Sequence, residues 1–197
     1  MIRLLGEADY QRQRWKNGAG WTTEIARGAA PGADGFRWRV SVAEIEDDCT
    51  FSVFPGFDRI LLLLAGQGLE LIIAGQPEPV ILGEPHAQVR FAGEAEVQCR
   101  LLGGPTRDFN VMHQRGVVDA DVEVRRLHEA ADVVADTESL LHVVDGEITA
   151  SAGSETATAR ENDTLHVDLR NDRSGTLNIA GDATLIMVKL TDVHATI

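Results

Sequence analysis

Basic residues are scarce in this chain of 197 residues, which has 18 lysines and arginines against 31 aspartates and glutamates, a net charge of −13. A chain this acidic lacks the broad basic surface that binds nucleic acid or an anionic membrane. The longest hydrophobic run, Ile60 to Ala65, is far too short to span a bilayer. No basic segment followed by an apolar run opens the chain, so we see no secretory signal. We therefore expect a cytoplasmic protein that binds neither nucleic acid nor membrane.

Metal-binding and nucleophilic motifs are also missing. The two cysteines, Cys49 and Cys99, lack metal or redox spacing, and we interpret them as reduced, buried thiols. The six histidines form no HxH or HxxxH pair, so the ligand set of zinc or iron is not visible. His166 and Asp168 share a strand face, but such a lone pair is more often exposed than ligating. With no serine-hydrolase elbow or phosphate-binding loop either, we expect no metal and no cofactor.

Short strand-like segments are abundant, at roughly ten-residue spacing with Gly, Pro, Asn and Asp between them. Phe36 to Ile45 is the clearest, because Trp38 and Val40 fall on one face while Arg39 and Ser41 fall on the other. That polar face meets either solvent or, if the sheet closes around a polar interior, a cavity. The pattern predicts an all-β sandwich or barrel.

Turn signals divide the strands. Gly66-Gln67-Gly68 and Asp145-Gly146 each predict a hairpin, and 128–139 is less patterned, which indicates a short helix or a loop. Further turns are predicted at residues 28–35, 171–175 and 181–182. The apolar strand before Gly66 resembles the one before Gly146, 80 positions later. Such an internal echo suggests two related β units in tandem.

Charged, polar, glycine and aromatic residues are concentrated in residues 15–24, Trp-Lys-Asn-Gly-Ala-Gly-Trp-Thr-Thr-Glu. The glycines let the backbone approach a ligand closely, and successive amides in such a turn can form an anion-binding nest. Lys16 adds a positive charge and three hydrogen-bond donors. The alternative is a glycine-rich turn stapled by two tryptophans, with Lys16 in water.

Further polar groups lie among aromatic residues. Arg59 opens an apolar strand after the Pro55-Gly56 turn, where it could hold a carboxylate through two hydrogen bonds. The alternative is a structural ion pair between Asp58 and Arg59. Asp108 and Asn110 share a strand face that meets either solvent or a cavity. Cations, amides and hydroxyls beside an apolar wall suit a small carboxylate ligand.

Four segments in order resemble the signature of the HutD/Ves family: residues 15–24, Trp38–Ala43, Phe51–Arg59 and Arg107–Met112. Ala19 stands where the family often has a third glycine. The resemblance implies a bicupin, two tandem cupin-like β-barrels in one chain, without the usual metal-binding histidines. We place the N-terminal barrel, with the pocket, at residues 1–118 and the C-terminal barrel at 119–197.

The resemblance also implies a link to histidine utilisation. HutD proteins are regarded as modulators of that pathway that bind an intermediate such as formylglutamate or urocanate, and Ves proteins are tied loosely to stress responses. Because cupin edge strands commonly pair between subunits, the family also allows a homodimer.

We accordingly expect a non-catalytic protein that binds a small anionic metabolite and modulates histidine utilisation. Lys16, Arg39 or Arg59 would hold the carboxylate, while Glu24 and Asp58 would orient these cations. The predicted ligand-binding residues are Lys16, Asn17, Gly18, Gly20, Thr22, Glu24, Arg39, Ser41, Asp58, Arg59 and Asn110.

Two alternatives stay open. The first is an enzyme, an isomerase or hydrolase that acts on a small carboxylate without metal and uses Glu24 or Asp58 as general base. The second is a protein-interaction module in which the same polar residues form only structural ion pairs. A pH-dependent turnover would favour the enzyme, and ligand binding insensitive to Lys16→Ala and Arg59→Ala would favour the interaction module.

Overall fold

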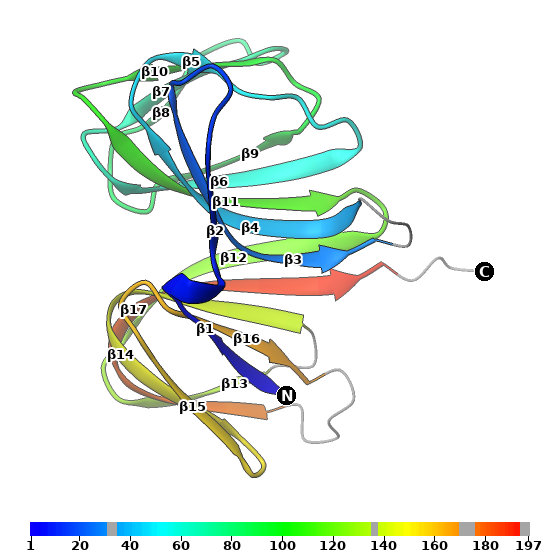
Figure 1. Cartoon of the computed structure of the whole chain (residues 1–197), viewed down its shortest axis with the longest axis vertical. Coiled ribbons are helices and arrows are strands. Elements are labelled where there is room, and N and C mark those ends of the chain that lie inside the picture. Colours follow the sequence, from blue (N-terminus) through cyan, green and yellow to red (C-terminus); the bar gives the residue numbers. More distant parts are fainter. Residues whose placement is uncertain (31–34, 135–137, 170–175, 194–197) are drawn as a thin grey trace. The chain divides into compact units, whose positions relative to one another are not determined.

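The described part of the chain is built almost wholly from β-strands. The computed structural model describes residues 1–30, 35–134, 138–169 and 176–193 (Figure 1). Within these ranges the helical structure is a single 3-10 turn, η1 (Glu7–Asp9). The predicted all-β class is confirmed. None of the helical structure in the same ranges is long and apolar enough to cross a membrane.

Two compact units divide the chain. Unit 2 is Gln11–Val118, and unit 1 combines Met1–Tyr10 with Asp119–Ile197. We had expected the first ten residues to belong to the N-terminal barrel. Instead, β1 (Ile2–Leu5) pairs antiparallel with β16 (Thr164–Asp168), which places these residues in unit 1.

Unit 2 contains two antiparallel sheets. The first has the strand order β2-β3-β4-β11-β6-β9, and the second has the order β5-β10-β7-β8. The bounds are β2 (Gln11–Arg14), β3 (Gly20–Ala29), β4 (Phe36–Ile45), β5 (Cys49–Thr50), β6 (Phe57–Ala65), β7 (Leu69–Ile73), β8 (Val80–Leu82), β9 (Gln88–Ala92), β10 (Val97–Leu101) and β11 (Thr106–Gln114). The strand predicted at Phe36 to Ile45 is confirmed as β4.

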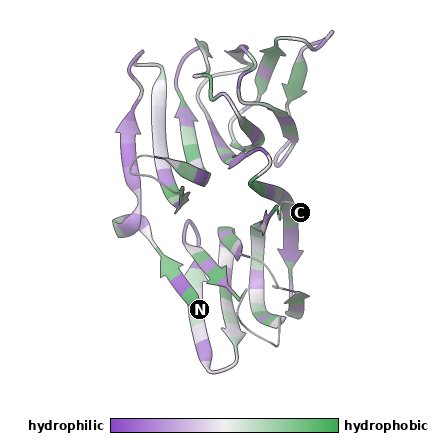
Figure 2. Ribbon diagram, turned by 90° about the vertical axis from the view of Figure 1, so that its right-hand side faces the viewer, coloured by the Kyte–Doolittle hydropathy of each residue, from purple (hydrophilic) through white to green (hydrophobic). Residues whose placement is uncertain are grey.

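The core of unit 2 joins its two sheets. Leu61 and Leu63 of β6 pack in one cluster with Leu69 and Leu71 of β7, and each is at most 1% exposed. Apolar residues alternate with polar ones along several of these strands, as the mixed colouring in Figure 2 shows. Because cluster members come from both sheets, the sheets pack face to face.

The hairpin predicted at Gly66-Gln67-Gly68 is wrong. The strand before these glycines, β6, pairs with β11 and β9, whereas the strand after them, β7, pairs with β10 and β8. The glycines therefore carry the chain from one sheet to the other. Two short strands separated by glycine look alike in sequence whether they pair with each other or lie in facing sheets.

Unit 1 is organised around one antiparallel sheet. Its strand order is β1-β16-β14-β17-β12, with β13 paired to β17 and β15 paired to β14. The remaining bounds are β12 (Val118–Leu127), β13 (Ala130–Val134), β14 (Glu138–Ala152), β15 (Glu155–Arg160) and β17 (Thr176–Asp192). Its core is apolar, with Leu141, Val143, Ile148 and Leu185 all fully buried.

Two turns predicted in unit 1 are also wrong. Asp145-Gly146 lies inside β14 at a bulge, and Gly181 lies inside β17, so both strands run through the expected turns. The two glycines adopt φ angles of +85° and +149°. A side chain at Gly146 would meet the backbone of Asp182, and one at Gly181 would meet the backbone of Glu147. Glycine here permits close approach of two long, bent strands rather than chain reversal.

The stretch at 128–139 is a strand rather than a helix or a loop over most of its described length. Residues 130–134 form β13, which pairs with β17 through Ala131 and Ile179 among others. Residues 135–137 and the turn expected at 171–175 lie outside the described residues, as do residues 31–34 of the loop expected at 28–35, whose first two residues belong to β3 instead. Tertiary pairing with β17 therefore decides the structure of an acidic segment without clear periodicity.

Candidate ligand-binding pocket

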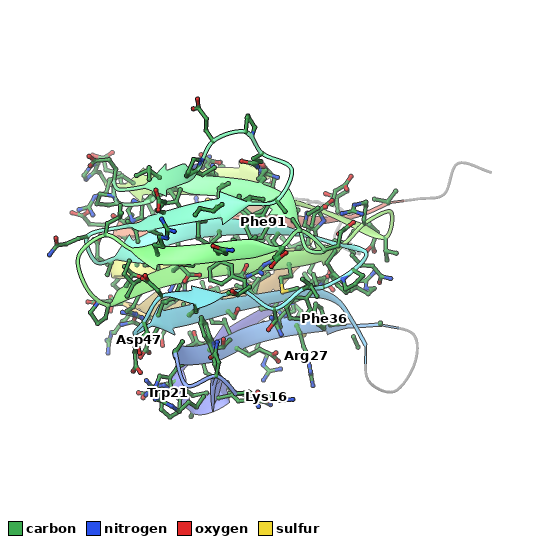
Figure 3. All side chains as sticks on the ribbon, turned by 90° about the horizontal axis from the view of Figure 1, so that it is seen from above. Lys16, Trp21, Arg27, Phe36, Asp47 and Phe91 are labelled. Atoms are coloured by element: carbon green, nitrogen blue, oxygen red, sulfur yellow. The ribbon has the colours of Figure 1, made fainter. Side chains whose placement is uncertain are left out.

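A cavity of about 720 Å³ lies within unit 2. Seen from above, Lys16 and Trp21 lie at the β2–β3 edge of the unit, and Phe91 lies on its far side (Figure 3). The cavity is lined by Gln11, Arg12, Gln13, Arg14, Trp15, Lys16, Asn17, Thr22, Glu24, Arg39, Ala43, Thr50, Phe51, Ser52, Phe54, Arg59, Leu61, Asp108 and Asn110. All of these residues belong to unit 2.

Strand register places the polar lining residues in rows. Arg39 of β4 and Arg59 of β6 both lie opposite Met112 of β11, so the three form one row across the sheet. Asn110 and Asp108 follow at two-residue steps on the same face of β11, because alternate residues of a strand share a face. The polar face of β4, which the sequence left open between solvent and cavity, therefore faces the cavity.

Arg59 is the most deeply placed cation of this face, with 7% exposure. Its Nε donates a long hydrogen bond of 3.4 Å to Asn110 Oδ1. The guanidinium carbon lies 5.2 Å from the ring centre of Phe51 and 5.0 Å from that of Phe91. Burial lowers the pKa of Arg59 to about 10, against the opposing charge of Asp108. Among the described residues no carboxylate lies within ion-pair distance of Arg59, so its charge is not neutralised by a direct partner.

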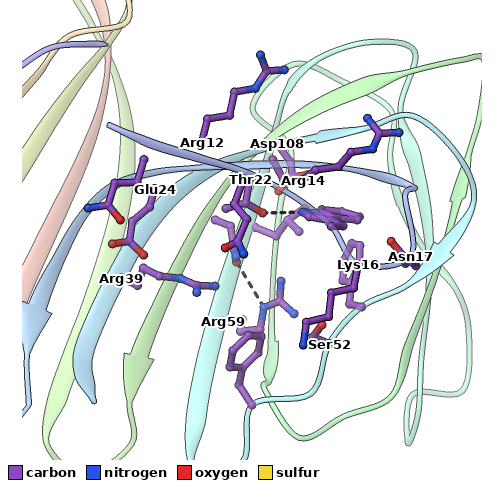
Figure 4. Close-up of a pocket in the computed structure, with 18 of the residues that line it drawn as sticks. Arg12, Arg14, Lys16, Asn17, Thr22, Glu24, Arg39, Ser52, Arg59 and Asp108 are labelled. Atoms are coloured by element: carbon purple, nitrogen blue, oxygen red, sulfur yellow. Dashed lines mark hydrogen bonds between the residues drawn. The ribbon is translucent and has the colours of Figure 1, made fainter. Parts of the chain in front are cut away.

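Arg39 lies beside it. One terminal nitrogen contacts Met112 Sδ at 3.1 Å, while its buried Nε has no hydrogen-bond partner among the described residues. Its guanidinium carbon lies 5.2 and 5.3 Å from the ring centres of Phe36 and Phe54. Burial lowers the pKa of Arg39, and the negative charge of Glu24 partly opposes that shift. In Figure 4 the guanidinium groups of Arg39 and Arg59 point into the same space.

Asp108 is a buried carboxyl group in the cavity wall, with 1% exposure. Its Oδ2 has no hydrogen-bond partner among the described residues. Burial raises the pKa of Asp108 to about 7, although the positive charge of Arg59 opposes the shift. Near neutral pH this group therefore exists in both the neutral and the charged form.

The mouth of the cavity is formed by part of the glycine-rich segment. Trp15 Nε1 donates a hydrogen bond of 2.7 Å to Thr22 Oγ1, and Asn17 Oδ1 accepts one of 3.1 Å from the amide of Ala19. Lys16 is exposed and extends toward Ser52 in Figure 4. The tryptophan thus fixes the wall, while the Lys16 charge stays available to a ligand.

Most of the predicted ligand-binding residues line this cavity. Those that do are Lys16, Asn17, Thr22, Glu24, Arg39, Arg59 and Asn110. Gly18, Gly20 and Ser41 do not. The Gly18 carbonyl accepts a hydrogen bond from Arg14, Gly20 packs against the backbone of Glu44, and Ser41 is buried between Glu24 and Asn110 in register.

Asp58 is not part of the cavity wall. Its carboxylate pairs with Arg115 at 2.6 Å, and Arg115 also pairs with Glu94 at 2.9 Å. Because neighbouring residues of a strand point to opposite faces, Asp58 faces away from the site that Arg59 faces. Asp58 therefore neither orients Arg59, as expected, nor forms the alternative structural pair with it.

Sequence reasoning missed several lining residues. Gln11–Arg14 carries no motif and reaches the cavity only because β2 pairs with β3. Arg12 and Arg14 flank the ring of Trp21 at 4.6 and 5.0 Å and pair with carboxylates of β4 and the turn after it, so their charges are already engaged. Asp108 shares a strand face with Asn110, which was the available signal for adding it to the site.

The described residues hold no group of three or more His, Cys, Asp or Glu that could bind a metal ion. The site instead combines two desolvated guanidinium groups, aromatic faces, an amide and a titrating carboxyl. Guanidinium groups offer paired N–H donors whose geometry matches a planar carboxylate.

Comparison with known proteins places these features in a family. The HutD family model matches residues 7–187. The chain is 46% identical over 112 residues to an uncharacterized 21.2 kDa protein in the hutC 3′ region of Pseudomonas putida, covering 57% of this chain and 58% of that protein. It is 36% identical over 111 residues to Protein Ves of Citrobacter koseri, covering 56% of each chain. These matches span little more than half the length of the curated relatives.

Solved structures agree over nearly the whole length. HutD from Pseudomonas fluorescens SBW25, determined in a formate condition, matches with a TM-score of 0.82 and 31% identity, over 98% of this chain and 99% of that one. Ylba from E. coli matches with a TM-score of 0.73 over 100% of this chain and 93% of that one, at 8% identity, which shows the fold alone. The predicted cupin fold and the resemblance to the HutD/Ves family are confirmed.

Proposed function

Because the chain belongs to the HutD family, we propose that it binds a small carboxylate metabolite in the unit 2 cavity and thereby modulates histidine utilisation. The ligands we consider are intermediates of that pathway, formylglutamate and urocanate foremost. Both carry a carboxylate and are small enough for a cavity of about 720 Å³.

The observation that carries the proposal is the state of Arg59. A buried cation without a direct carboxylate partner is costly, and the carboxylate of a bound ligand would supply the missing charge. Its terminal nitrogens are free of hydrogen bonds within the described residues, and Asn110 engages only Nε. An incoming carboxylate would accept from these nitrogens and lie between Arg59 and Arg39.

The rest of the wall fits the same ligand class. Phe51, Phe54 and Trp15 supply apolar and aromatic surface for the body of a small metabolite. Lys16 at the mouth would meet a second carboxylate, which formylglutamate has and urocanate lacks. Asp108, in its neutral form, would accept a hydrogen bond from an amide or imidazole N–H of the ligand through its carbonyl oxygen, without a charge that repels the carboxylate.

Calorimetric titration of the purified protein with formate, glutamate, formylglutamate, formiminoglutamate and urocanate tests the proposal. We expect saturable binding of at least one compound, and a loss of at least about 30-fold in affinity in Arg59→Met, since charge-assisted hydrogen bonds contribute about 2 kcal/mol or more. The matched control is Arg100→Met, which removes a surface arginine paired with Glu70 at 3.2 Å. It should bind as the wild type does.

Two results would overturn the binding proposal: no heat with any of the five compounds in folded protein, or equal affinity in Arg59→Met and wild type. The regulatory part has its own test. A bacterium lacking the gene should grow differently with histidine as nitrogen source, and Arg100→Met but not Arg59→Met should restore wild-type growth.

A second candidate function rests on Asp108. A carboxyl with a pKa of about 7 inside a cavity is suited to accept a proton at neutral pH. In an isomerase or hydrolase acting on a small carboxylate, Asp108 would take that part in place of Glu24 or Asp58. Turnover of the same five compounds, followed by nuclear magnetic resonance and abolished in Asp108→Asn, would establish it, whereas unchanged compounds would dismiss it.

A further inference from the structure

The two cysteines of the chain face each other in the second sheet of unit 2, and neither lines the cavity. Cys49 of β5 and Cys99 of β10 are direct partners in the antiparallel register. Cys49 is partly exposed and Cys99 is 1% exposed, and both are free thiols. The sequence predicted two reduced, buried thiols without any relation between them, and strand pairing brings them together.

Their geometry suits a covalent bond. Directly opposed residues in antiparallel strands have Cα atoms about 4.5 to 5.5 Å apart and side chains on the same face. A disulfide needs Cα atoms about 4.4 to 6.8 Å apart, so the pair falls within its range. Two hydrogen bonds hold this register, from Phe51 N to Val97 O at 2.9 Å and from Leu101 N to Asp48 Oδ1 at 2.8 Å.

The two thiols also differ in reactivity. A hydrogen bond from the Cys99 thiol lowers the pKa of Cys49, although burial and the charges of Asp108, Asp48 and Asp47 oppose this shift. The same hydrogen bond and burial raise the pKa of Cys99. The more exposed thiol is therefore the better nucleophile, and the buried thiol is placed to react second.

We propose that Cys49 and Cys99 form a peroxide-sensitive dithiol that closes to an intramolecular disulfide between β5 and β10. The Cys49 thiolate attacks one oxygen of hydrogen peroxide and breaks the O–O bond. The sulfur becomes a sulfenic acid, and hydroxide leaves and takes up a proton. The Cys99 sulfur then attacks the Cys49 sulfur, the S–S bond forms, and the sulfenic hydroxyl leaves as water with the Cys99 proton. Two thiols and one peroxide thus give one disulfide and two waters.

The disulfide would affect the cavity, because the residues that follow Cys49 in the chain line the cavity wall. Thr50 and Phe51 follow Cys49 directly and line the cavity, and Phe51 stacks against the Arg59 guanidinium. A bond from Cys49 to β10 would fix the start of this segment. The proposal does not depend on which ligand binds, since the thiols pair through the sheet alone.

To test the proposal, the reduced protein is treated with hydrogen peroxide. Its intact mass, the number of thiols that can be alkylated and its peptide map are then measured. We expect a mass loss of two hydrogens, disappearance of both thiols and a cross-linked peptide pair containing residues 49 and 99. Because the chain has 2 cysteines, the thiol count is unambiguous. Retention of both thiols in folded protein, or disulfide dimers as the main product, would overturn the proposal.

Single variants test the order of events. Cys99→Ser should accumulate a sulfenic acid at Cys49 that dimedone traps, because the second thiol is missing. Cys49→Ser should react with peroxide at least about tenfold more slowly, because the remaining thiol is buried and its pKa is raised. Equal rates in the two variants, with circular dichroism showing that both are folded, would contradict the assignment of Cys49 as the attacking thiol.

Discussion

Unit 1 and unit 2 both rest on a large antiparallel sheet, but the inner faces of these sheets carry different chemistry. In unit 1 the inner positions are filled with aliphatic residues such as Leu141, Val143 and Ile148. In unit 2 the strand faces that meet the cavity carry Arg59 and Asp108 among the leucines. The same class of sheet therefore carries an aliphatic core in one unit and a cavity lined by charged residues in the other.

The two glycines of the internal echo show how the difference is built. At Gly66 the chain leaves its sheet after β6 and crosses to the facing sheet. At Gly146 the chain continues through a bulge, and β14 runs on beside β17. Unit 2 thereby gains a second sheet that faces the first, with a space between the two sheets. In unit 1, by contrast, long strands bend and enclose the core with one sheet.

The difference between the two units is tested most strongly by an arginine placed in the core of unit 1. We expect Leu141→Arg to reduce the free energy of unfolding by more than about 4 kcal/mol, because the charge would be buried within a cluster of hydrophobic residues. Urea unfolding followed by circular dichroism measures this. The control Leu141→Met should cost less than about 1.5 kcal/mol. A stable, soluble Leu141→Arg protein would show that unit 1 tolerates charge as unit 2 does.

The buried carboxyl of unit 2 should make stability depend on pH. Burial raises the pKa of Asp108 in the folded protein to about 7, from the unfolded value of about 3.9. Its contribution to stability is therefore fully present below about pH 4 and is lost as the pH rises through 7. Asp108→Asn lacks this titration, so its stability relative to wild type should rise by up to about 4 kcal/mol between pH 4 and pH 8.

The same group should affect ligand affinity. Above pH 7 the Asp108 charge lies near Arg59 and competes with an anionic ligand, so affinity for a carboxylate should fall by up to tenfold per pH unit. Asp108→Asn should flatten the profile. Parallel pH profiles of wild type and variant, for both stability and affinity, would contradict the assigned titration.

The bent strands of unit 1 can be tested at a glycine. Gly181→Ala should lower the free energy of unfolding by about 2 to 3 kcal/mol, because a side chain at a φ of +149° would meet the backbone of Glu147. Gly153→Ala is the matched control, since its φ is +56° and nothing lies within 4 Å of an added carbon. That change should cost only about 1 kcal/mol. Equal costs would show that close strand approach does not require glycine at 181.

The smallest expected change in stability comes from Arg59→Met. An apolar side chain of similar length fits the aromatic surroundings and removes a buried charge, so stability should be unchanged or rise by about 1 kcal/mol. The binding of a carboxylate should be lost at the same time. Lost binding with unchanged or higher stability would indicate that the Arg59 charge serves ligand binding. A large loss of stability would indicate instead that Arg59 has a structural role.

Much of the fold could be predicted from the alternation of side chains. The period of two at β4 predicted its bounds and placed Arg39 and Ser41 on one face. It could not decide between solvent and cavity, because that depends on whether another segment, here residues 50–54, covers this face. The turns predicted at glycines were wrong for a similar reason. Local turn chemistry is similar for a hairpin, a sheet-to-sheet connection and a bulge, and distant partners decide which forms.

The site was predictable where its residues carried a motif. Residues of the segment 15–24 line the cavity, and so does Arg59, which follows the Pro55-Gly56 turn. Asp58 was predicted for its charge beside Arg59, although strict alternation along β6 already turns it to the opposite face. Gln11–Arg14 and Thr50 could not be predicted, because their place in the wall comes from the pairing of β2 with β3 and of β5 with β10.

The order in which the strands occur in the chain bears on how the protein is made. The Met1 amino group donates to the carbonyl of Asp168, 167 residues away, at 2.9 Å. At about 5 to 20 residues per second, β1 is synthesised on the order of 10 seconds before its partner β16. Unit 2 is continuous and has all its strands well before then. Unit 2 can therefore fold before β1 has a partner to pair with, and β1 is among the last of the described strands to join its sheet.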